Sequence, residues 1–117
     1  MGFGEAVQKG IANIGNFEGR AGRAEFWWFV LAVWIVQFVV DSLVYLIFNG
    51  FLENLFLFIV WAVAFVAYLS VGVRRLHDVG QPGWMIILAF LCCLILIPIY
   101  FWVQPSQGPN QYGPPPA

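Results

Sequence analysis

The sequence has very little charge for its length. Only 9% of its 117 residues are Asp, Glu, Lys or Arg, whereas an ordinary soluble domain has about 25%. Because 62% of the residues are hydrophobic, too little polar surface is available to keep such a chain in water. The formal net charge of −1 gives no reason to expect a nucleic-acid partner. We therefore expect an integral membrane protein.

Side chains that bind metals or carry out catalysis are equally scarce. The chain has one histidine, His77, and its two cysteines, Cys92 and Cys93, are adjacent inside an apolar run. Neighbouring cysteines rarely form a disulfide, and two of them do not make a metal site. The phosphate-binding glycine loop and the HExxH, CxxC and GxSxG motifs are absent. The sequence predicts no metal, no cofactor, no catalytic residue and no enzymatic activity.

Three long apolar runs dominate what is present. They cover about residues 26–48, 55–73 and 84–103. As a helix, the first run is about 35 Å long, enough to cross a hydrocarbon core of roughly 30 Å. Tryptophans stand at the ends of the first and third runs, where they are typical of a membrane interface. The sequence predicts an all-α fold with three transmembrane helices.

The two ends of the chain differ from these runs. In residues 1–16, the side chains of Phe3, Val7, Ile11 and Ile14 recur at helical spacing between polar residues. This pattern favours a short amphipathic helix lying flat at the membrane surface, and the alternative is a frayed terminus. Residues 104–117 are rich in Pro, Gly and Gln, which is typical of a flexible tail. We expect one membrane domain, residues 1–103, followed by this tail.

The basic residues predict an orientation. Lys9, Arg20 and Arg23 precede the first run, whereas Arg74 and Arg75 lie between the second and third runs. With three spans all five cations fall on one side of the membrane. Positive residues mark the cytoplasmic side, so we expect a multi-pass protein with a cytoplasmic N-terminus and an external tail.

Four stretches of the sequence carry a family resemblance. They are FEGRAGRAEFWWF at 17–29, VRRLHDVGQPGW at 73–84, the third apolar run, and GPNQYGPPP at 108–116. In this order and spacing they resemble the small bacterial inner-membrane family catalogued as domain of unknown function 805, which includes YhaH-like proteins. The chain has Pro82 where the family usually has Ser, and Pro115 where it often has Asp. The resemblance implies a polytopic bacterial inner-membrane protein and supplies no established activity.

The arginines near the cytoplasmic surface form the first candidate site. The residues that would bind a lipid headgroup or another anion are Arg20, Arg23, Arg74, Arg75 and His77. A guanidinium group takes a phosphate through two hydrogen bonds, and four of them at one interface would attract anionic lipids. In the alternative interpretation, the arginines set the topology and form structural ion pairs with Glu25 and Asp78.

A polar face inside the first run forms the second candidate site. Gln37, Asp41 and Tyr45 are spaced four residues apart and share one face of a helix. A charge at Asp41 would cost at least about 2.5–3.5 kcal/mol in the bilayer, so this carboxyl should face protein or water, or be protonated. A structural hydrogen bond, a proton or solute path, and contact with the outer interface all remain open.

These observations lead to two hypotheses for function. In the first, a non-enzymatic inner-membrane protein binds anionic lipid or a partner protein through its arginine face. In the second, the chain is a subunit of an oligomeric channel or transporter that uses the face of Gln37, Asp41 and Tyr45. Because three spans are too few to enclose a pore, the second hypothesis requires a homo-oligomer or a partner membrane protein.

Overall fold

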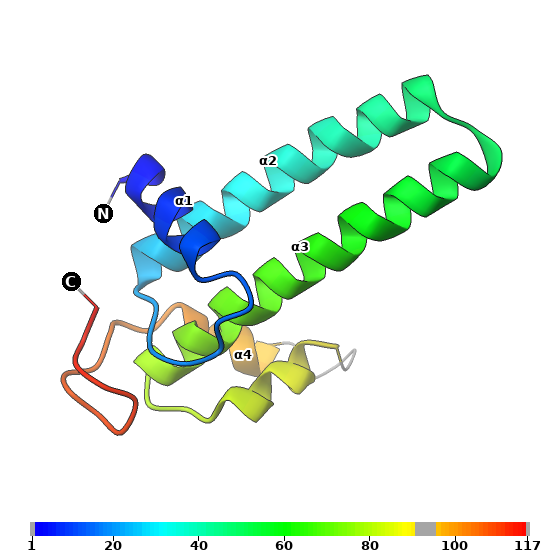
Figure 1. Ribbon diagram of the computed structural model, residues 1–117. Coiled ribbons are helices and arrows are strands. Elements are labelled where there is room, and N and C mark those ends of the chain that lie inside the picture. The colour runs from blue at the N-terminus through cyan, green and yellow to red at the C-terminus, as the bar shows by residue number, and fades with distance from the viewer. Residues whose placement is uncertain (1, 91–95, 117) are drawn as a thin grey trace.

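The computed structural model describes residues 2–90 and 96–116, and all the regular elements of these residues are helical. The elements are α1 (Phe3–Ala12), α2 (Arg23–Ile47), α3 (Gly50–Asp78), the 3₁₀ helix η1 (Gly83–Phe90) and α4 (Leu96–Trp102). α2 and α3 form a long hairpin, α1 lies across the beginning of α2, and η1 and α4 lie beside the last part of α3 (Figure 1). The prediction of an all-α fold is confirmed.

The hairpin contains the two described helices that are long and apolar enough to cross a membrane. α2 has 25 residues and α3 has 29, with mean hydropathies of 2.2 and 2.4 over their most apolar windows. At 1.5 Å per residue both exceed a hydrocarbon core of roughly 30 Å. Many of their large apolar side chains point outward: Phe38 is 75% exposed, Leu46 82% and Phe51 78%. These are the dimensions and the surface of a membrane-embedded hairpin.

The third apolar run differs from the expected single helix. Its described parts are η1 and α4, which pack against each other and against α3. Residues 91–95, which include Cys92 and Cys93, lie outside the described residues. A third spanning helix over residues 84–103 is therefore not confirmed.

The tail also lies elsewhere than expected. It was predicted on the side opposite the arginines, but the backbone N–H of Gln107 donates to the carbonyl of Asp78, the last residue of α3, at 3.1 Å. Both ends of the chain thus lie at the end of the hairpin where α2 begins and α3 ends, which we call the arginine end (Figure 1). The chain returns there because η1 and α4 pack side by side instead of extending in one line.

α1 is bound to the hairpin by a close backbone contact. Ala6 and Gly10, four residues apart and fully or almost fully buried, face α2. A Cβ atom at Gly10 would lie 2.2 Å from the ring of Phe29, so only glycine allows this approach. Phe3 at the start of α1 meets the edge of the Trp28 ring, with centroids 5.6 Å apart. α1 is therefore packed against α2 over much of its length.

Candidate functional site

The arginine end owes its shape to the way α3 stops. Gly80 has φ of +79°, a conformation that other residues rarely adopt. Its N–H donates to the carbonyl of His77 at 3.0 Å, and the N–H of Gln81 donates to that of Leu76 at 2.9 Å. This pair of bonds is the Schellman arrangement that closes many helices at a glycine. It leaves Arg74, Arg75, His77 and Asp78 on the last two turns of α3.

Arg20 is buried at the centre of this end and is fully hydrogen-bonded. Its Nε donates to Oδ1 of Asp78 at 3.0 Å, and its Nη2 donates to the carbonyls of Asp78 and Gln107 at 3.1 and 2.6 Å. Its Nη1 donates to the carbonyls of Gly108 and Gly113, both at 2.9 Å. A guanidinium has five N–H donors, and here each has an acceptor. Arg20 therefore has no donor left for a ligand.

Arg75 is held in the same cluster. It forms an ion pair with Asp78, three residues further along α3, and both side chains are fully buried. Its other donors bond to the carbonyls of Ala21, Trp102 and Gln104, at 3.5 Å for Ala21 and 3.1 Å for Trp102. The helix hairpin and the tail are thus joined through one guanidinium group.

Asp78 is the acceptor that two arginines share. Its carboxylate receives hydrogen bonds from Arg20, Arg75 and the hydroxyl of Ser106. Two positive groups against one negative group leave an excess positive charge in a buried site. The oxygen ends of the surrounding carbonyl groups offset that charge, because their dipoles point toward the guanidinium groups.

Arg74 belongs to a separate ion pair with spare capacity. Its Nη1 donates to Oε2 of Glu25 at 2.6 Å, and Nζ of Lys9 lies 3.6 Å from Oε1 of the same carboxylate. The side chains of Arg74 and Glu25 are only 2% and 1% exposed. Nε and Nη2 of Arg74 and Oε1 of Glu25 have no hydrogen-bond partner among the described residues. This pair is the part of the arginine end that could still bind something.

The remaining two predicted anion-binding residues lie at the edge. The ring of His77 stacks on Tyr112 at 4.0 Å, and its Nδ1 is 3.0 Å from the carbonyl of Gly19. Arg23 is exposed and makes no side-chain hydrogen bond or ion pair with the described residues. The structure thus brings Arg20 and Arg75 together in the cluster and leaves Arg23 outside it.

Sequence reasoning missed the contribution of the tail. Its part of the cluster consists of Gln104, Ser106, Gln107, Gly108, Asn110, Tyr112 and Gly113. Composition favoured disorder, because a count of residue types does not reveal what the backbone carbonyls bind. A signal was nevertheless present in GPNQYGPPP, one of the four stretches that carry the family resemblance. In it the Asn110 side chain accepts from the N–H of Tyr112 at 2.8 Å and closes a turn.

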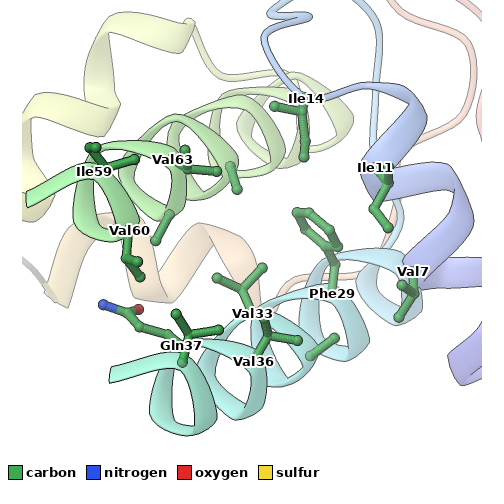
Figure 2. A pocket seen from close by; sticks show the side chains of 14 residues that line it. Val7, Ile11, Ile14, Phe29, Val33, Val36, Gln37, Ile59, Val60 and Val63 are labelled. Carbon is green, nitrogen blue, oxygen red and sulfur yellow. The ribbon is translucent and has the colours of Figure 1, made fainter. Parts of the chain in front are cut away.

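A groove with a volume of about 370 Å³ lies between α1, α2 and α3, next to this polar end (Figure 2). Val7 and Ile11 of α1, Val33 and Val36 of α2, and Val60 and Val63 of α3 are among its lining residues. Phe29 stands toward the arginine end, and the amide of Gln37 is the polar group of the lining. Ligand sites in proteins typically measure about 300–1,000 Å³ and are mostly apolar, so the groove is large enough for a small ligand.

The predicted intramembrane polar face does not converge on one site. Gln37 is among the lining residues of the groove, and its amide lies at the edge beside Val60 (Figure 2). Asp41 is half-buried, and its Oδ1 has no hydrogen-bond partner among the described residues. Tyr45 is 62% exposed on the outer surface of the hairpin. Among residues 2–90 and 96–116, no group of three His, Cys, Asp or Glu side chains is placed to hold a metal ion.

The apolar hairpin and the buried ionic cluster at one of its ends define a small helical membrane protein. The sequence model of the family described as "Protein of unknown function (DUF805)" matches residues 14–114, and the chain belongs to this family. The four stretches that carry the resemblance all contribute to the arginine end, through Arg20, Asp78, Trp102 and Gly113 among others.

Two curated relatives support this class. The chain is 33% identical to "Inner membrane protein YhaI" of Escherichia coli (strain K12) over 107 residues, which cover 88% of this chain and 87% of the relative. It is 30% identical to "Inner membrane protein YhaH" of the same organism over 115 residues, covering 92% and 93% of the two chains. No solved structure matches the chain. The relatives are bacterial inner-membrane proteins, in agreement with the two apolar helices.

Proposed function

We propose that this protein is a non-enzymatic lipid-binding protein of the bacterial inner membrane, and that the groove between α1, α2 and α3 holds one acyl chain. The observation that carries the proposal is the lining of the groove, which is aliphatic apart from Phe29 and Gln37. In a membrane-embedded hairpin such a groove is surrounded by hydrocarbon. A lipid tail is the apolar ligand that is always present there. Because the acyl chain leaves other lipid tails and not water, van der Waals packing against the lining residues must favour its binding.

The arrangement in the membrane forms part of this proposal. α2 and α3 cross the bilayer, α1 lies at the cytoplasmic surface, and the arginine end faces the cytoplasm. Support comes from the basic residues: all five belong to α1, the loop before α2, the first turn of α2 or the last turns of α3. η1 and α4 then enter from the cytoplasmic side and return to it, which brings the tail to Arg20.

The groove is tested by filling it. Ala64 is 6% exposed and lines the groove, so Ala64→Leu places a larger side chain where the acyl chain would lie. Ala62, two residues away on the exposed surface of α3, provides the matched control Ala62→Leu. We expect Ala64→Leu to reduce the phospholipid retained per protein several-fold, measured by native mass spectrometry in mild detergent. Ala62→Leu should retain as much as the wild type. Equal retention in both variants would falsify the proposal.

A second candidate function rests on Asp41. Its Oδ1 is buried without a hydrogen-bond partner among the described residues, at a depth where water is scarce. In an oligomeric channel or transporter, the half-exposed Asp41 side chain would face a neighbouring chain or a water-filled path. The mass of the detergent-solubilised particle separates the two functions, because a lipid-bound monomer favours the first and a closed ring favours the second.

A further inference from the structure

Two N–H donors on one edge of the Arg74 guanidinium have no acceptor among the described residues, although the nearby Arg20 guanidinium is fully hydrogen-bonded. Nε and Nη2 form the edge that takes two oxygens of a phosphate or carboxylate in parallel. Both atoms are buried and have no acceptor among the described residues, whereas every N–H of Arg20 has one. Buried donors are rarely left unpaired, so this edge indicates a bound ligand or ordered water.

Glu25 and Arg74 lie on the helix faces that line the groove, on the side of the arginine end. On α2, Glu25 precedes the groove residue Phe29 by four positions; on α3, Arg74 follows the groove residue Ala67 by seven. These spacings keep each pair on one face of its helix, at separations of about 6 and 10 Å along the axis. Beyond Phe29 and Ala67, these helix faces therefore change from apolar to charged in the direction of the arginine end.

The charges at this position favour a single anion. Arg74 and Lys9 contribute two positive charges, and Glu25 contributes one negative charge. Oε1 of Glu25, which would repel an anion, lies 3.6 Å from Nζ of Lys9 and is offset by it. One positive charge remains, which would balance the single negative charge of one phosphodiester. Trp27 and Trp28, exposed on the same turns of α2 as Glu25, are typical of headgroup depth.

We propose that Nε and Nη2 of Arg74, together with Nζ of Lys9, bind the phosphate of an anionic phospholipid whose acyl chain lies in the groove. The inference rests on the proposed function and names the ligand class of the same site. Of the three buried arginines, Arg74 is the one with donors left for the anion, because Arg20 and Arg75 are engaged by Asp78 and the tail.

The test compares variants of the full chain in mild detergent. Phosphatidylglycerol and a diacylglycerol with the same acyl chains are offered in equal amounts, and retained lipid is measured by native mass spectrometry. Arg74→Lys keeps the charge but removes the two-oxygen edge, and Lys9→Gln removes the second cation. We expect each substitution to reduce phosphatidylglycerol retention by about tenfold, which is the effect of losing one charge-assisted hydrogen bond. Diacylglycerol retention should not change.

Arg23→Gln is the matched control, because it removes the same charge from an exposed position at the same end. It should leave the preference for phosphatidylglycerol intact. If Arg74→Lys fails to fold, Lys9→Gln decides the result, because Lys9 is partly exposed. Wild-type retention in Lys9→Gln and Arg74→Lys, combined with lipid loss in Ala64→Leu, would refute the headgroup site and leave the groove proposal standing. Complete displacement of phosphatidylglycerol by inorganic phosphate would also overturn the inference, since the ligand would then be free phosphate.

Discussion

Asp78 is the residue on which the arginine end most depends. Its carboxylate is fully buried and is the acidic group that Arg20 and Arg75 share. Removing one partner of a buried ion pair leaves an uncompensated charge, whereas an exposed pair contributes little. The interactions at Asp78 therefore contribute to stability in a way that sequence alone does not reveal.

We predict that Asp78→Asn destabilises the protein by about 3–5 kcal/mol, because two guanidinium groups lose their one carboxylate. Thermal unfolding in detergent, followed by circular dichroism, measures the change. The control is Glu18→Gln, which neutralises an exposed carboxylate in the loop before α2 and should cost no more than about 0.5 kcal/mol. Equal unfolding temperatures for the two variants would show that the cluster contributes no net stability.

Among the elements, α1 offers the sharpest test of packing. Gly10 and Gly4 lie in the same helix, but a Cβ at Gly10 would meet the ring of Phe29 at 2.2 Å whereas a Cβ at Gly4 would meet nothing within 4 Å. Alanine raises helix propensity at either position by about 0.5–1 kcal/mol. The two substitutions therefore share their local effect and differ in the contact with α2.

We predict that Gly10→Ala loosens α1 from α2 while Gly4→Ala does not. Amide hydrogen exchange of residues 6–12 should become faster in Gly10→Ala and stay unchanged or become slower in Gly4→Ala. Because Val7 and Ile11 line the groove, Gly10→Ala should also release bound lipid. Unchanged protection in Gly10→Ala would mean that Phe29 rotates away at little cost.

At the scale of the whole molecule, the proposed arrangement has two crossings and both ends in the cytoplasm. Reporter fusions test it: a fusion at Asn49 should read external, and one after Gln104 should read cytoplasmic. The reason is that the carbonyls of Gln107, Gly108 and Gly113 bond to Arg20, which precedes the first crossing. An external reading after Gln104 would restore the three-span arrangement.

The types of residues and their spacing determined how much of this fold could be predicted from the sequence. A bilayer admits only helices and closed barrels, so the first two apolar runs had to be helices, and α2 and α3 correspond to them. The third run is also apolar, and Pro98 near its end predicted a bend but not two packed helices. Glu25 and Asp78 were named as partners of the arginines because few acidic residues stood nearby. The tail carbonyls could not be named, because every residue has one.

The hydrogen bonds from Arg20 to the tail can form only after the tail has been synthesised. The carbonyls that saturate Arg20 belong to residues made 87 to 93 positions later. At roughly 5–20 residues per second, translation takes about 4 to 19 seconds to supply them. In the arrangement proposed above, the guanidinium would stay hydrated on the cytoplasmic side during that interval. Arg20 would then serve first as an orientation signal for the nascent chain and only later as the buried hydrogen-bond donor seen in the structure, and a chain that stops before residue 107 would keep it in the first role.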